Sequence, residues 1–218
     1  MKKTLVAFLL GVLMLTLIAC GNQQETADES PSVAIVNGTE ISQEQLDAHL
    51  EQIKMSYAQF GIDFEGEEGQ AMLEQLKEEV LNGLIEQQVL LQAAQSEGYT
   101  ADPEQVDEAL ADIKAQFASE EELQEILDSL GFSMEDLREE LANELVITQY
   151  LDDQIGEIEL SEEEQQEAYL SYEEETGEEA DEETKQMIRE QLRWQKEGEL
   201  RQELVERLKQ ESEIEILL

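Results

Sequence analysis

The chain has 218 residues, of which 55 are acidic and 13 are basic, so its formal net charge at pH 7 is −42. This charge excludes nucleic-acid binding by phosphate neutralisation, which requires clustered Lys and Arg side chains. Hydrophobic residues nevertheless make up 40% of the sequence and recur at helical spacing with only two prolines, which favours a folded helical protein over a disordered acidic chain.

The first 19 residues have the features of a bacterial export signal. Two lysines precede an apolar run over residues 5–19, which is shorter than the roughly 20 residues that a membrane-spanning helix needs. Cys20 is the only cysteine in the chain, and residues 17–20 resemble a lipobox. The resemblance implies cleavage after Ala19 and a diacylglycerol thioether on Cys20, so the protein would contact the membrane through lipid.

Short segments at the two ends of the domain favour β-structure. Residues 20–32, the lipidated cysteine and a polar stretch, are expected to form a flexible tether. Residues 33–36 predict a strand that stops at the turn dipeptide Asn37-Gly38, and residues 214–217 predict another strand. Because neither strand is long enough to be stable alone, we expect them to pair as a minimal two-stranded element.

Capping residues and apolar spacing predict six to seven helices between these strands. The expected helices cover approximately residues 42–60, 69–97, 102–117, 119–130, 133–156, 161–175 and 181–210. The expected N-caps are Ser42, Asp102, Ser119, Ser133 and Ser161. The second helix is apolar nearly all round over its second half and is therefore the expected central buried helix. The predicted fold class is all-α, an elongated helical bundle in one domain over residues 33–218.

Several segments carry a family resemblance through their order and spacing. They are the strand, turn and Ile-Ser of residues 33–42, the two helices and glycine break of residues 90–117, the helices of residues 120–151, and the closing helix and strand of residues 188–218. Together they resemble the SurA and PrsA family of extracytoplasmic chaperones. The resemblance implies a SurA N-terminal-like helical chaperone domain.

One departure from that family concerns catalysis. Many members insert a parvulin prolyl isomerase domain, of roughly a hundred residues, between the acidic helix and the last long helix. Here about a dozen residues, mostly Glu, separate Tyr172 from Lys185, and these are too few for such a domain. Isomerase sites also use histidines, and His49 is the only one in the chain. The isomerase activity therefore does not carry over, and no catalytic residue or cofactor is expected.

Metal chemistry is not expected either. His49 lies beside an apolar stripe without a second histidine or cysteine, which favours a surface or boundary role over a ligand role. The glutamate runs at residues 162–164 and 173–175 lack the spacing of a calcium loop and are expected to be solvated helix faces.

The last helix carries two apolar stripes. The broader one is expected to face the bundle, whereas Met187, Trp194 and Val205 fall together on a different side. Two interpretations remain open for this second stripe: another helix covers it, or it lines a partly open groove that presents Trp194 and Met187 to unfolded chains. The loop aromatics Phe60 and Phe64 raise the same question.

The resemblance implies a membrane-anchored holdase on the extracytoplasmic face, binding unfolded or exported polypeptides without catalysis. The alternative is a lipoprotein interaction module that docks one dedicated folded partner at the cell surface. Under the first interpretation, the expected client-binding residues are Met187, Trp194, Val205, Phe60 and Phe64. Nucleic acid is not an expected partner, and no oligomeric state follows from the sequence.

Overall fold

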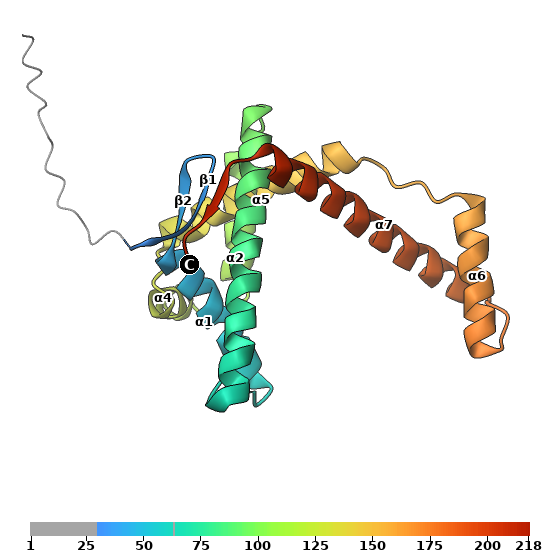
Figure 1. Ribbon diagram of the computed structural model, residues 1–218, viewed down its shortest axis with the longest axis horizontal. Coiled ribbons are helices and arrows are strands. Elements are labelled where there is room, and N and C mark those ends of the chain that lie inside the picture. Colours follow the sequence, from blue (N-terminus) through green and yellow to red (C-terminus); the bar gives the residue numbers. More distant parts are fainter. Residues whose placement is uncertain (1–29, 63) are drawn as a thin grey trace, which may run out of the picture.

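The structure, a computed structural model, describes residues 30–62 and 64–218 (Figure 1). Its elements are β1 Ser32–Val36, β2 Thr39–Ser42, α1 Gln43–Gln59, α2 Gly66–Ser96, α3 Pro103–Lys114, α4 Glu120–Ser129, α5 Met134–Ile155, α6 Glu162–Thr176, α7 Glu182–Glu211 and β3 Ile214–Ile216. The expected all-α, elongated class is confirmed. The expected signal segment, Cys20 and most of the tether lie outside the described residues.

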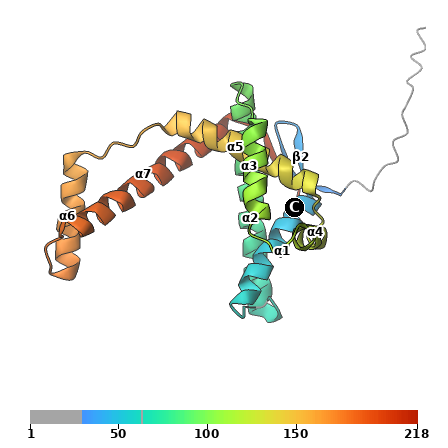
Figure 2. The ribbon, with the colours of Figure 1, turned by 180° about the vertical axis from the view of Figure 1, so that it is seen from behind.

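The molecule consists of a body and a projecting arm. The body is built around α2, with α1, α3, α4, α5 and the sheet beside it (Figures 1 and 2). The arm, which we define as α6 with residues 182–200 of α7, extends away from the C-terminal end of α2. In the described part of the chain, no helix combines the length and hydropathy needed to cross a membrane.

The sheet joins the two ends of the domain, as expected. β3 pairs antiparallel with β1, in a register that sets Ala34 opposite Ile216 and Val36 opposite Ile214. The expectation of two strands is wrong, because β2 also pairs with β1 and the order is β2-β1-β3. β2 has no visible alternation in its sequence, since Ile41 is its only buried residue.

Asn37 ties the hairpin turn to the C-terminal strand and to α2. Its backbone has a φ of +50°, a left-handed conformation that Asn tolerates better than most residues. The Glu213 N–H donates to its Oδ1 (2.8 Å), while its Nδ2 donates to Gln92 Oε1 (2.8 Å) and Ser212 Oγ (3.1 Å). Three segments that are distant in sequence therefore meet at one side chain.

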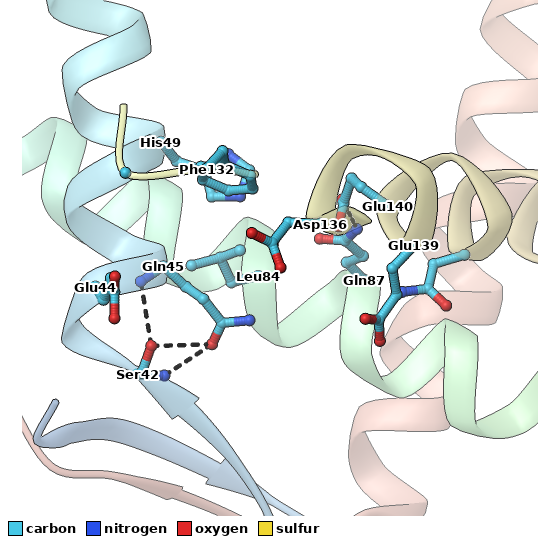
Figure 3. A pocket seen from close by; sticks show the side chains of 12 residues that line it. Ser42, Glu44, Gln45, His49, Leu84, Gln87, Phe132, Asp136, Glu139 and Glu140 are labelled. Atoms are coloured by element: carbon cyan, nitrogen blue, oxygen red, sulfur yellow. Dashed lines mark hydrogen bonds between the residues drawn. The ribbon is translucent and has the colours of Figure 1, made fainter. Parts of the chain in front are cut away.

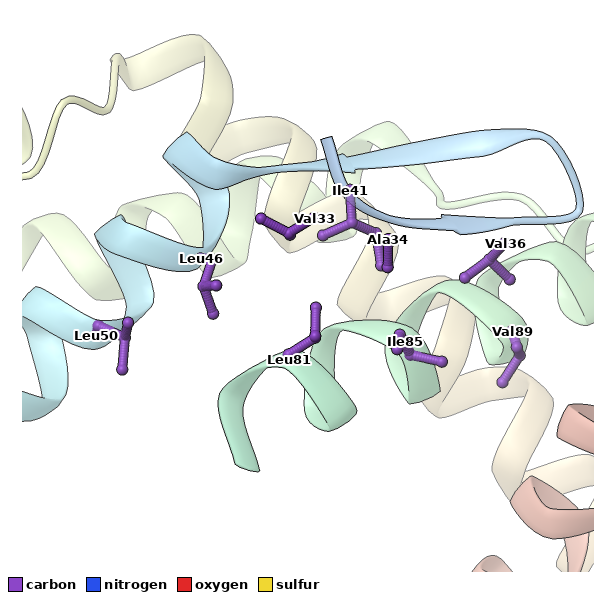
Figure 4. Close-up of a cluster of buried hydrophobic side chains, with 9 residues drawn as sticks. All are labelled: Val33, Ala34, Val36, Ile41, Leu46, Leu50, Leu81, Ile85 and Val89. Carbon is purple, nitrogen blue, oxygen red and sulfur yellow. The ribbon is translucent and has the colours of Figure 1, made fainter. Parts of the chain in front are cut away.

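Two buried clusters share α2. The first packs the inner face of the sheet and α1 against α2, and comprises Val33, Ala34, Val36, Ile41, Leu46, Leu50, Leu81, Ile85 and Val89 (Figure 4). The second packs α5 and α7 against α2, and comprises Leu90, Ala94, Val146, Ile147, Tyr150, Leu204 and Val205. The expectation that α2 is the central buried helix is therefore confirmed.

All five expected N-caps are confirmed. In each, the side-chain oxygen accepts a bond from a backbone N–H two or three residues further on. The largest boundary differences are at α2, which begins at Gly66 rather than near residue 69, and at α3, which ends at Lys114 rather than near residue 117. Beyond Lys114 the backbone forms tighter turns than an α-helix. The N–H groups of Gln116 and Phe117 each donate to the carbonyl three residues earlier, rather than four.

We predict that Asn37→Ala lowers the free energy of unfolding by about 2 kcal/mol, because it adds strain at a positive φ and removes three side-chain hydrogen bonds. Asn37→Gly is the control: it relieves the strain but not the lost bonds, so its effect should be smaller. Urea titration followed by circular dichroism measures both. An unchanged midpoint for Asn37→Ala would contradict this role.

Candidate functional site

The arm is held together mainly by polar contacts along one side of α7. Arg189 Nη1 donates to the Tyr169 hydroxyl (2.8 Å), and Lys185 Nζ lies 5.8 Å from the centre of the same ring. Lys196 Nζ donates to Glu164 Oε1 (2.7 Å) and to the Glu159 carbonyl (3.0 Å). No residue of α6 is buried, so these contacts rather than a core position α6 on α7.

Glu164 is the centre of this joint. The Lys196 ammonium and the capping box with Ser161 hold the pKa of the Glu164 carboxyl down at about 2. The Ser161 N–H donates to Glu164 Oε2 (2.6 Å), and the Glu164 N–H donates to Ser161 Oγ (3.2 Å). One carboxylate therefore caps α6 and also binds α7.

The connection between α6 and α7 is short. α6 ends at Thr176 and α7 begins at Glu182, so only residues 177–181 join them. Ala180 in this turn is buried. This is the position at which the sequence resemblance implied an inserted domain in other family members, and the turn holds none.

The side of α7 opposite these polar contacts is apolar and open. Met187 and Trp194 are 57% and 75% exposed. At about 100° per residue they lie on one side of the helix, roughly half a turn from Arg189 and Lys196. They therefore point away from α6 into solvent.

Val205 continues the same stripe but is covered. It is 5% exposed and packs in the second cluster against α2 and α5. The expectation that Val205 lies with Trp194 on one contact surface is therefore wrong. Each of the two interpretations of the stripe describes one part of it: the stripe is covered where α7 crosses the body and open along the arm.

The expected loop aromatics lie at the opposite end of α2, at the tip of the α1–α2 hairpin. Phe60 follows the last turn of α1 and is 80% exposed. Phe64 is half-buried, with its ring centre 5.7 Å from that of Tyr57. The structure therefore does not bring Phe60 and Trp194 together: the arm and the hairpin tip are separate apolar surfaces (Figures 1 and 2).

Sequence reasoning missed further exposed apolar side chains in both places. They are Leu170 on α6 and Met55, Ile62 and Met72 around the hairpin tip. Leu170 has no apolar stripe on α6 to identify it, because that helix is acidic throughout. The others lie on or beside helices whose inner stripes gave the stronger pattern.

A third feature is a groove between α1, α2 and the start of α5. Two cavities, of about 330 Å³ and 440 Å³, adjoin there and share His49, Leu84 and Gln87 in their walls. Figure 3 shows His49 beside Phe132, with Asp136, Glu139 and Glu140 on the facing helix. His49 is half-buried, so the expectation of a boundary histidine is confirmed.

Comparison with known proteins identifies the family. The profile of the SurA-like N-terminal domain family matches residues 1–151. The foldase protein PrsA of Clostridium botulinum strain Hall is 30% identical over 182 residues, which cover 77% of this chain and 53% of that protein. PrsA of Clostridium perfringens strain SM101 is 27% identical over 178 residues, covering 77% and 51%. The chain therefore belongs to the SurA-like N-terminal domain family, and it spans about half the length of these curated relatives.

We predict that Lys196→Gln raises the pKa of Glu164 from about 2 toward its ordinary value of 4.5. Because the pKa of the Glu164 carboxyl is lowered in the folded joint, its ionised form stabilises the joint at pH values above 4.5. This stabilisation is lost as the pH falls from 4.5 toward about 2. The joint of the variant should therefore weaken at a higher pH than that of the wild type. Carboxyl NMR titration measures the pKa, and hydrogen exchange of the α6 amides at pH 7 should be faster in the variant.

Lys54→Gln is the matched control, because Lys54 pairs with Glu51 on the surface of α1 (2.7 Å) and lies far from the arm in sequence. It should leave exchange in α6 unchanged. Equal exchange of α6 in wild type and Lys196→Gln would show that the ion pair does not hold the joint.

Proposed function

We propose that this chain is a membrane-tethered holdase, which binds unfolded exported polypeptides through exposed apolar side chains and releases them without chemistry. The observation that carries the proposal is the open face of α7, where Trp194 is 75% and Met187 57% exposed. The two side chains lie on one side of the helix about two turns apart, and contiguous exposed apolar surface marks interaction sites. Membership of the SurA-like family supports the same function.

The distribution of the apolar surface suits clients without a fixed structure. Phe60 and Trp194 lie on separate parts of the molecule, so an extended polypeptide could contact both, whereas a small folded ligand could not. Methionine and aromatic side chains adapt to partners of varied shape. The net charge of −42 favours basic clients and makes their capture sensitive to ionic strength.

The proposed anchor is the lipid on Cys20, with mature protein beginning at that residue. An extended chain spans at most about 3.6 Å per residue, so the ten residues 20–29 could hold Ser30 up to roughly 35 Å from the bilayer. A diacylglycerol-modified cysteine supplies the two acyl chains that stable anchoring requires. A tether of this length would keep the domain close to polypeptides that emerge on the extracytoplasmic face.

We predict that Cys20→Ala abolishes lipid attachment, so that the protein is either released from the membrane or retained unprocessed. Cell fractionation and metabolic labelling with a fatty acid measure the two effects. Unchanged labelling and unchanged partitioning of Cys20→Ala would contradict the anchor.

We also predict that the full chain in lipid nanodiscs suppresses the aggregation of several unrelated unfolded proteins, with empty nanodiscs as the blank. Trp194→Ala should weaken binding of an unfolded client by about 2 kcal/mol, or roughly thirtyfold. Because Trp194 is exposed, helical content should not change. Gln195→Ala, the adjacent exposed residue on another side of α7, is the matched control and should bind normally.

The alternative function gives a different result in the same assay. A module for one dedicated folded partner would protect none of the unrelated clients, and crosslinking in cells would recover a single protein. That outcome would reject the holdase.

A further inference from the structure

The groove beside His49 has an apolar end and an acidic end. The apolar end is lined by Ile53, Val80, Gly83 and Leu84, and the acidic end by Glu44, Asp136, Glu139 and Glu140. His49, Leu84 and Gln87 line both cavities, so the two ends adjoin. We call this feature the α1–α5 trough.

Gly83 lines the apolar end, and the space beside it is open. A Cβ at this position would meet no atom within 4 Å. By contrast, a Cβ at Gly69 would collide with the Phe64 backbone, so that glycine is required by the fold. Glycine inside a helix costs about 0.5–1 kcal/mol relative to alanine. At Gly83 no collision requires glycine, and the absence of a side chain leaves the apolar end of the trough open.

The charge of the trough is of one sign. Among residues 30–62 and 64–218, no Lys or Arg side chain lines either cavity. Glu140 accepts a hydrogen bond from Gln87, and Asp136 is occupied in the N-cap of α5 with Ser133. Neither Glu44 nor Glu139 has a basic partner within 4.0 Å in the described part of the chain. The acidic end is therefore complementary to a cationic group.

We propose that the α1–α5 trough binds basic amphipathic segments of unfolded polypeptides. In this arrangement an aliphatic or aromatic client side chain lies over Gly83, between Ile53 and Val80. A Lys or Arg of the same segment lies at the acidic end, between Glu44 and Glu139. The proposal rests on the proposed function only in that the chain binds unfolded polypeptide, and it adds a second surface distinct from the Trp194 face.

Two other occupants fit less well. The chain preceding β1 reaches the rim of the trough, since the Glu44 N–H donates to Ser30 Oγ (3.0 Å) and the Gln43 N–H donates to the Pro31 carbonyl (2.8 Å). Residues 21–29 are acidic and contain no Lys or Arg, so the carboxylates of the trough repel them. A second copy of the chain carries the same net charge of −42 and is repelled likewise.

The test uses the full chain in lipid nanodiscs and a short fluorescein-labelled peptide of alternating leucine and lysine. Two companion peptides replace either leucine by serine or lysine by glutamate. Fluorescence anisotropy should detect binding of the first peptide, and both companions should bind roughly tenfold or more weakly. Equal binding of the serine companion would overturn the apolar end, and equal binding of the glutamate companion would overturn the acidic end.

Gly83→Leu fills the trough without removing any contact, and its higher helix propensity should raise the melting temperature. It should weaken binding of the leucine–lysine peptide roughly tenfold. Asn82→Leu adds the same side chain at the adjacent exposed position of α2, outside the trough, and should bind like wild type. Equal binding by Gly83→Leu and wild type, or equal loss in both variants, would overturn the proposal.

A pair of charge variants tests the trough without altering its shape. Glu44→Gln with Glu139→Gln should weaken peptide binding and flatten its dependence on salt. Glu135→Gln with Glu144→Gln removes the same charge from exposed positions of α5 outside the lining and should change neither. Equal effects of the two pairs would show that net charge, rather than the trough, attracts the peptide.

The trough and the Trp194 face can fail independently. Loss of peptide binding in Trp194→Ala but not in Gly83→Leu rejects the trough and leaves the holdase intact. Peptide binding that depends on Gly83, in a protein that suppresses no aggregation, rejects the holdase and supports the trough. Displacement of the peptide by a synthetic peptide of residues 21–29, or by self-association of the protein, would identify one of the two disfavoured occupants and reject the client.

Discussion

The packing of α2 against two partners determines the rest of the structure. The sheet packs against Leu81, Ile85 and Val89 of α2, whereas α5 and α7 pack against Leu90 and Ala94. Since β1 and β3 come from opposite ends of the domain, β3 can pair with β1 only when the last helix has returned to α2. Pairing of the two ends of the domain is thus coupled to the packing of α7 on α2. The direction in which α7 leaves the body follows from these two contacts.

The arm is a consequence of the length of α7. Its C-terminal third is anchored by Leu204 and Val205 in the core, and the remaining turns extend beyond the body, where α6 is their main partner. No residue of the arm is buried, so the position of the arm depends on this anchored end of α7. The arm can therefore expose Trp194 and Met187 to solvent at little cost to the stability of the body, which separates the proposed binding surface from the groups that hold the fold together.

Local signals in the sequence predicted most elements, whereas long-range contacts decided the remainder. The N-caps follow from Ser and Asp side chains near their own helices, and the β1–β3 pairing follows from two segments too short to be stable alone. β2 was missed because only Ile41 is buried, although Asn37-Gly38 marked the hairpin turn. The trough had no sequence pattern, since residues 42–143 contribute to it from three helices and a loop. The second apolar stripe of α7 is buried where it packs against α2 and exposed beyond the end of α2. The periodicity of the sequence does not indicate where that end lies.

The placement of the few basic residues connects the fold with the proposed function. Seven of the 13 Lys and Arg residues lie on α7. Lys185, Arg189 and Lys196 hold α6, and Lys209 pairs with Glu86 on α2 (3.4 Å). Three of the seven α7 cations thus position α6, and none of the seven lines the trough. Because no basic side chain lines the trough, attraction of a basic client there weakens as the ionic strength rises, whereas burial of its apolar side chains is not screened by salt.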